Sequence, residues 1–79
     1  MKLGIDVPTL GKAKLIARLA ALKTTTHVQD GGAYVQDMSC SQILIDTDWN
    51  EEQLETWLYN AKGVDYIGTF VVDAESEAT

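Results

Sequence analysis

The chain has 79 residues, and it carries six basic side chains against twelve acidic ones, with one histidine and one cysteine. Apolar residues make up 46% of the chain, which is enough for one small core and too many for a disordered acidic segment. One cysteine excludes an internal disulfide framework and a thiolate zinc site. We expect no signal peptide, since Asp6 and Pro8 interrupt the first residues, and no apolar run approaches the roughly 18 residues of a membrane span. We expect a single soluble intracellular domain over residues 1–79.

The charge is divided unevenly along the chain. Residues 1–23 hold five basic residues and one acidic residue, whereas residues 24–79 hold one basic residue and eleven acidic ones. An acidic body argues against direct binding to nucleic acid. It favours either a surface that keeps a small protein soluble or a surface that meets a basic partner.

The first predicted element is a helix that begins near Pro8 or Thr9, because proline suits the first turn and threonine can cap it. Apolar residues recur there at helical spacing, as Leu10, Ala13, Ile16, Ala17 and Ala20, with Leu15, Leu19 and Leu22 widening the stripe. The β-branched residues 24–26 end the helix.

Residues 24–29 and 33–36 favour two strands, and Asp30-Gly31-Gly32 between them favours a hairpin turn, since glycine accepts the positive φ of tight turns. Residues 42–46 give the strongest strand pattern of the chain. Residues 37–41 are consistent with a bulge or a loop.

The second predicted helix has the clearest signals. Asp48 can cap it, with Glu51 three residues later to complete a capping box. One face is apolar, formed by Leu54, Trp57, Leu58 and Ala61. The opposite, exposed face holds Glu52, Glu55, Thr56 and Tyr59. Lys62 falls in the last turn, and Gly63 is a natural left-handed cap.

Residues 64–72 alternate as a closing strand, in which Gly68 suggests a close approach or a bulge. Residues 73–79 have the composition of a frayed acidic tail. The elements together predict an α+β domain, with helices and strands in the order α-β-β-α-β. We expect a small antiparallel sheet of three or four strands, with two helices packed on one face.

The sequence offers little for catalysis or metal binding. Asp46, Asp48 and Asn50 match three positions of a calcium loop, but Glu51 stands where that loop needs glycine, and Trp57 stands where it needs glutamate. Cys40 has no basic neighbour in sequence to activate it, and His27 is the only histidine. We therefore expect a protein that is not an enzyme and that needs no cofactor or metal.

Surface recognition is the remaining class of function. Aromatic residues are enriched at interface hot spots, and charge steers encounter with a partner. Trp49 fits either an anchor exposed to a partner or a residue at the edge of the core. The candidate partner-binding residues are Asp37, Asp46, Asp48, Trp49, Glu51, Glu52, Glu55 and Tyr59.

Residues 46–59, Asp-Thr-Asp-Trp-Asn-Glu-Glu-Gln-Leu-Glu-Thr-Trp-Leu-Tyr, carry a local resemblance. Their second half, residues 52–59, is similar to a helix in phage-encoded inhibitors of the type I-F CRISPR surveillance complex. A short acidic α+β chain also resembles phage inhibitors of host RNA polymerase. The resemblance implies a protein of the bacterial cytoplasm that blocks a host complex by contact, without chemistry of its own.

We therefore expect a small acidic phage-type inhibitor of a host nucleic-acid-handling protein or ribonucleoprotein complex, acting as an anti-CRISPR or host-takeover protein. Its acidic surface would compete with nucleic acid for a basic surface on that partner. The alternative is a self-associating structural or assembly protein, in which the basic first helix of one copy faces the acidic surface of another. A homodimer is consistent with that reading, and no membrane contact is expected.

Overall fold

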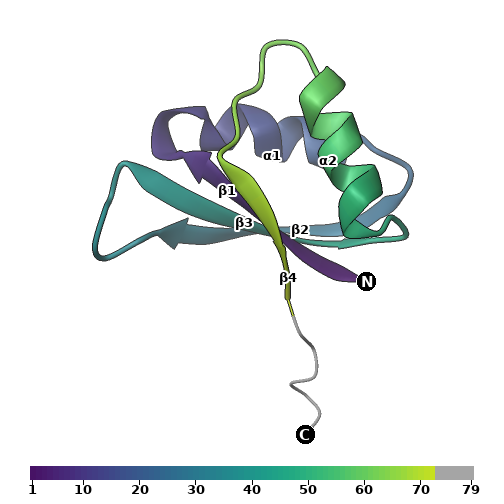
Figure 1. The fold of residues 1–79 in the computed structure, drawn as a ribbon, viewed down its shortest axis with the longest axis horizontal. Coiled ribbons are helices and arrows are strands. Elements are labelled where there is room, and N and C mark those ends of the chain that lie inside the picture. The colour runs from purple at the N-terminus through teal and green to yellow at the C-terminus, as the bar shows by residue number, and fades with distance from the viewer. Residues whose placement is uncertain (73–79) are drawn as a thin grey trace, which may run out of the picture.

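The computed structural model describes residues 1–72, which form a four-stranded sheet and two α-helices (Figure 1). The predicted tail, residues 73–79, lies outside the described residues. The strands and helices in chain order are β1 (Lys2–Pro8), a 3-10 turn η1 (Thr9–Gly11), α1 (Lys12–Ala20), β2 (Thr25–Ala33), β3 (Cys40–Thr47), α2 (Glu51–Asn60) and β4 (Gly68–Val71).

The chain begins with a strand, so the predicted order α-β-β-α-β is wrong at its start. In β1, Leu3, Ile5 and Val7 are buried on the helix-covered face, and the residues between them point to the other face. Pro8 is the last residue of this strand, with an extended ψ of 135°, and it is also the N-cap of η1; the α-helix begins only at Lys12. Proline has no N–H to donate to a neighbouring strand, so it is tolerated at the end of a strand better than in its middle.

All four strands are antiparallel to their neighbours, in the sheet order β2-β3-β1-β4. Helix α1 connects β1 to β2 across β3, and α2 connects β3 to β4 across β1. This is the ferredoxin-like arrangement of two split βαβ units. Both helices lie on the same face of the sheet (Figure 1), so the predicted α+β class, with its antiparallel sheet covered on one face, is confirmed.

The core lies between the sheet and the two helices. It is formed by Leu3, Ile5, Val7, Leu15, Leu19, Ile43, Ile45, Leu54 and Leu58, all at most 2% exposed. In α1, only Leu15 and Leu19 are buried. The predicted apolar stripe is therefore correct only in part. Leu15 and Leu19 are in the core, and Ile16 and Leu22 pack against it. Leu10 lies in η1 with its side chain fully exposed, and Ala13, Ala17 and Ala20 face solvent.

Asp30-Gly31-Gly32 does not turn the chain, which corrects the predicted hairpin. The segment is an irregularity inside β2, where the register with β3 shifts between Asp30 and Gly32. Gly32 has a φ of 87°, and its N–H donates to the Asp30 carboxylate at 2.8 Å. The hairpin connection is the following segment, residues 34–39, so residues 37–39 belong to a loop.

The N-cap of α2 is Asn50, two residues later than the predicted cap at Asp48. The Asn50 side chain accepts the Gln53 N–H at 2.8 Å, and the Gln53 side chain accepts the Asn50 N–H at 3.0 Å. The capping box is thus formed by Asn50 and Gln53. The predicted inward face is confirmed, because Leu54 and Leu58 are buried. Gly63 has the predicted positive φ, 80°, but lies beyond the helix end at Asn60.

Strand β4 is shorter than predicted, and residues 64–67 precede it as an irregular segment. A Cβ added at Gly68 would meet no atom within 4 Å, so the predicted close approach is absent at that position. The close approach is at Gly4, which pairs with Phe70 and lies against its ring.

Two basic residues of α1 make polar contacts within the domain. Lys12 pairs with Asp30 of β2 at 3.1 Å, and Arg18 Nη1 donates to the Lys62 carbonyl oxygen at 2.8 Å. That carbonyl lies just past the negative end of α2, where a cation is favourable. Within residues 1–72, neither helix has the length and apolar character to cross a membrane.

Candidate functional site

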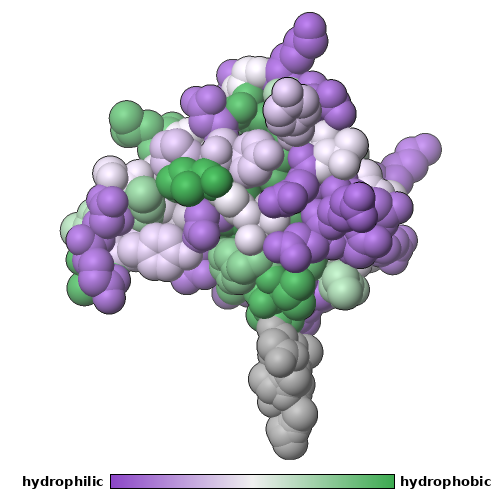
Figure 2. All heavy atoms as spheres, in the orientation of Figure 1, coloured by the Kyte–Doolittle hydropathy of each residue, from purple (hydrophilic) through white to green (hydrophobic). Residues whose placement is uncertain are grey.

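The outer side of α2 and the turn before it carry four acidic residues, Asp48, Glu51, Glu52 and Glu55. Figure 2 shows hydrophilic side chains gathered over this helix. Tyr59 stands 82% exposed near its C-terminal end. We call the following group the acidic α2 surface: Asp48, Trp49, Glu51, Glu52, Glu55 and Tyr59.

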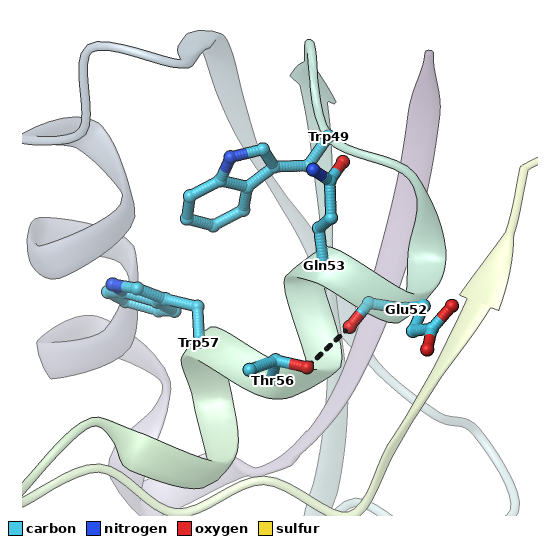
Figure 3. A pocket seen from close by; sticks show the side chains of 5 residues that line it. All are labelled: Trp49, Glu52, Gln53, Thr56 and Trp57. Carbon is cyan, nitrogen blue, oxygen red and sulfur yellow. Dashed lines mark hydrogen bonds between the residues drawn. The ribbon is translucent and has the colours of Figure 1, made fainter.

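A shallow hollow of about 450 Å³ lies on this surface. It is lined by Trp49, Glu52, Gln53, Thr56 and Trp57 and is called here the indole hollow (Figure 3). The indoles of Trp49 and Trp57 form one rim, with ring centroids 6.1 Å apart and planes tilted by 47°. Glu52 lies on the other side of the hollow, with its backbone carbonyl toward Thr56 and its carboxylate pointing away from the indoles (Figure 3).

The two tryptophans reach the hollow from different elements. Trp57 extends from α2, and both indoles pack partly against the core. Trp49 follows β3 directly. Its backbone N–H donates to the Thr47 hydroxyl at 3.2 Å, and that hydroxyl donates to the Thr24 carbonyl oxygen at 3.0 Å. Trp49 was predicted to be either at the edge of the core or exposed to a partner. The residue is half-buried: it packs against the core and also lines the hollow.

The acidic side chains on α2 are held differently from one another. The Thr69 hydroxyl of β4 lies 3.0 Å from Glu51 Oε2 and 2.9 Å from Glu55 Oε2, and its single proton reaches one carboxylate at a time. These two carboxylates therefore lean toward β4. The Glu52 carboxylate has no hydrogen-bond partner among residues 1–72, although its backbone carbonyl accepts the Thr56 hydroxyl at 3.0 Å.

The negative charge on the acidic α2 surface is not neutralised by the described part of the chain. The ion pair found within residues 1–72 is that of Lys12 with Asp30, away from this surface. Glu51 and Glu52 occupy the first turn of α2, where the helix dipole favours them. The surface thus presents uncompensated carboxylates beside two aromatic rings.

Two predicted site residues lie elsewhere. Asp37 is in the loop before β3, and the eight residues of that strand, roughly 25 Å, separate it from Asp48. The Ser39 hydroxyl and N–H, and the Cys40 thiol, donate to Asp37 and hold its pKa below the ordinary value. Asp46 lies opposite Lys2 in the ladder between β1 and β3, on the face of the sheet that the helices do not cover.

Three residues that line the indole hollow were not among the predicted site residues: Gln53, Thr56 and Trp57. Their spacing from Trp49 is a helical one, so the signal was in the sequence. The prediction assigned Trp57 to the core by the same periodicity, and the side chain does contact the core, but it is only half-buried.

A second hollow, of about 310 Å³, lies at the hairpin end of the sheet. It is lined by Asp6, Tyr34, Gln36, Asp37, Cys40 and Ile67. The Tyr34 hydroxyl donates to the Asp6 carboxylate, and this bond raises the pKa of Tyr34 to about 12. Among residues 1–72, no three His, Cys, Asp or Glu side chains gather as a metal site would require.

We compared the chain with known protein families, curated proteins and solved structures. No family model, no curated protein and no solved structure matches the chain.

Proposed function

We propose that this protein is a small acidic inhibitor of phage type that binds a host nucleic-acid-handling complex through its acidic α2 surface. It would act as an anti-CRISPR or host-takeover protein in the bacterial cytoplasm. The partner contributes a basic surface that otherwise contacts nucleic acid. The bound protein covers the basic side chains of the partner and so prevents nucleic acid from binding to them.

The observation that carries this proposal is the uncompensated charge of the α2 carboxylates beside half-exposed indoles. A helix rich in carboxylates carries a row of negative charges, as the phosphates of a nucleic acid do. The attraction between these charges and a basic surface raises the rate of association. The aromatic rings supply the apolar area that gives an interface its affinity. The local resemblance of residues 46–59 to phage inhibitors supports the same function.

The proposal is tested by capture from bacterial lysate with the whole chain as bait, eluted along a salt gradient. We expect one nucleic-acid-handling complex, released at moderate salt, since exposed charge pairs are screened by ions. Added protein should then reduce the binding of nucleic acid by the purified complex. A captured complex whose binding of nucleic acid is unaffected would contradict inhibition.

Charge reversal locates the surface. Glu52→Lys changes the charge on the acidic α2 surface, and Asp46→Lys makes the same change on the opposite face of the sheet. We expect Glu52→Lys to weaken capture and Asp46→Lys to leave it unchanged. Adding Glu55→Lys to Glu52→Lys should weaken capture further and reduce its salt dependence. Equal capture by both single variants would overturn the assignment to α2.

A specific observation also favours the second candidate, a self-associating structural protein. Strands β2 and β4 are the edges of the sheet, so β2 presents one side of its backbone to a further strand. The register irregularities in β2 make such pairing less regular. Sedimentation over a range of concentrations separates the candidates, because a self-associating protein gains mass with concentration and the inhibitor does not.

A further inference from the structure

We propose that Lys14, Arg18 and Lys62 form a patch that binds the phosphate backbone of the nucleic acid carried by the partner complex. This inference rests on the proposed function, because a complex that handles nucleic acid holds phosphates beside the basic surface that the acidic α2 surface would cover. The three side chains are called here the three-cation patch. Two of them belong to the basic first part of the chain, residues 1–23.

The three cations meet where the C-terminal end of α2 leads into the loop toward β4. Lys14 and Arg18 lie one turn apart on α1, and both reach the peptide unit that follows Lys62. Arg18 Nη1 donates to the Lys62 carbonyl oxygen at 2.8 Å. Lys14 Nζ lies 3.1 Å from the position that a Cβ would take on Gly63. Two cations from α1 therefore flank the residue that carries the third.

No carboxylate among residues 1–72 forms an ion pair with this patch. The ion pair found there joins Lys12 to Asp30, and Asp65, the carboxylate nearest to Lys62 along the chain, pairs with none of the three cations. The C-terminal end of α2 offers the equivalent of about half a negative charge. That is too little to balance three positive charges, so most of the charge of the patch is uncompensated.

The donors of the patch are mostly free. Within residues 1–72, the Arg18 guanidinium, which has five N–H donors, makes one hydrogen bond, and neither lysine ammonium makes any. Lys14 and Lys62 are exposed, and Arg18 is half-buried. A nucleic-acid strand carries one phosphate charge per nucleotide, so adjacent phosphates can contact the three cations together, and each contact releases counterions.

The negative net charge of the chain does not exclude this contact. At 1.5 Å per residue, Glu55 stands about 10 Å and Glu52 about 15 Å from Lys62 along α2. The Debye length at physiological ionic strength is about 8 Å, so repulsion from these carboxylates is largely screened at the patch. The acidic α2 surface and the three-cation patch lie toward opposite ends of α2, so one can contact the partner's cations while the other contacts its nucleic acid.

The first test uses the full chain and a fluorescein-labelled oligothymidylate, with binding followed by fluorescence anisotropy at several salt concentrations. We expect a slope of about −2 in the plot of log K against log salt, since three contacts contribute about −0.7 each for a single strand. The matched probe is the methylphosphonate oligothymidylate, which has the same bases and no backbone charge, and it should not bind. Equal binding of the two probes would overturn the inference.

Matched variants locate the contact. Lys14→Gln and Lys62→Gln each remove one charge from the patch, and Lys2→Gln removes one from the face of the sheet that the helices do not cover. We expect each patch variant to weaken oligothymidylate binding about two- to fivefold, as for one exposed charge pair, and to reduce the slope by about 0.7. Lys2→Gln should change both less. An equal effect of all three would show that net charge sets the binding and would overturn the inference.

The captured complex gives a second readout. Digesting its nucleic acid with nuclease before the salt gradient should release the unaltered chain at lower salt, as early as the double variant Lys14→Gln with Lys62→Gln. If the double variant elutes earlier than the unaltered chain even after digestion, the patch contacts an acidic segment of the partner protein and the inference is wrong.

The two proposals fail separately. If Glu52→Lys weakens capture of the host complex but Lys14→Gln, Lys62→Gln and Lys2→Gln bind oligothymidylate alike, the acidic α2 surface acts without the three-cation patch. If the patch variants lose oligothymidylate binding but no nucleic-acid-handling complex is captured, the patch binds nucleic-acid phosphates and the proposed function is wrong.

Discussion

The ring of Phe70 on β4 lies directly over Gly4 on β1, on the face of the sheet that no helix covers. A Cβ at Gly4 would overlap the ring, so the absence of a side chain there is what seats β4 against β1. Strand β4 is an edge strand of only four residues, and Gly4 with Phe70 is one of its four paired positions with β1.

We therefore expect Gly4→Ala to lower the free energy of unfolding by about 1–3 kcal/mol, the usual cost of overpacking. Urea denaturation followed by circular dichroism measures it. The double variant Gly4→Ala with Phe70→Ala removes the clash, so it should be more stable than the sum of the two single changes predicts. Strict additivity would show that the ring does not lie over residue 4.

The inward face of α1 can be tested by two leucines. Leu15→Ala should cost about 2–5 kcal/mol, because Leu15 is completely buried between α1 and the sheet. Leu10→Ala should change stability by less than about 0.5 kcal/mol, since the Leu10 side chain is fully exposed. Thermal or urea unfolding measures both. A greater loss at Leu10 than at Leu15 would show that the Leu10 side chain is buried, as the sequence pattern predicted.

The start of α2 gives a third prediction. Asn50→Ala removes the side-chain acceptor for the Gln53 N–H, and we expect a loss of about 1 kcal/mol in unfolding free energy. Asp48→Ala is the control, because Asp48 makes no such bond to the helix and should cost less. If Asp48→Ala were the more costly change, the cap would be at Asp48.

The Tyr34–Asp6 hydrogen bond predicts a dependence on alkaline pH. The pKa of Tyr34 is raised from 10.0 to about 12, mainly because its hydroxyl donates to the Asp6 carboxylate. The bond's contribution to stability is therefore complete below pH 10 and is lost as pH rises from 10 to about 12.

The ultraviolet absorbance of tyrosinate, taken as the difference between the unaltered chain and Tyr34→Phe, isolates the titration of this phenol. Asp6→Asn should bring the pKa of Tyr34 down toward its ordinary value, because the charged acceptor is gone. A Tyr34 titration unmoved by Asp6→Asn would contradict the assigned cause.

Strand β3 and the two buried leucines of α2 were predictable from local pattern. Residues 42–46 and the spacing of Leu54 and Leu58 gave correct elements, because one periodicity dominates each. Strand β1 was missed although Leu3, Ile5 and Val7 alternate, since Pro8 fits both a strand end and a helix start. The choice between them depends on β3 and β4, which pair with β1 from distant parts of the chain.

The sequence predicted most of the acidic residues of the site, but it did not predict how the site residues are arranged in space. Helical spacing places Glu52 and Glu55 on the outside of α2, which local sequence can give. The separation of Asp37 and Asp46 from α2 depends on strand register and on which face the helices cover. The hollow itself depends on the turn that brings Trp49 beside Trp57, and that turn is fixed by the contact of Thr47 with Thr24.

The crossed order of the sheet means that the recognition surface cannot be separated from the whole domain. Strand β1 lies between β3 and β4, so a fragment that contains β3, α2 and β4 lacks the strand that joins its two edges. A ten-residue helix on its own is too short to be stable in water. A synthetic peptide of residues 46–60 should therefore compete poorly with the intact protein, and a mimic of this surface will need a scaffold that replaces the sheet.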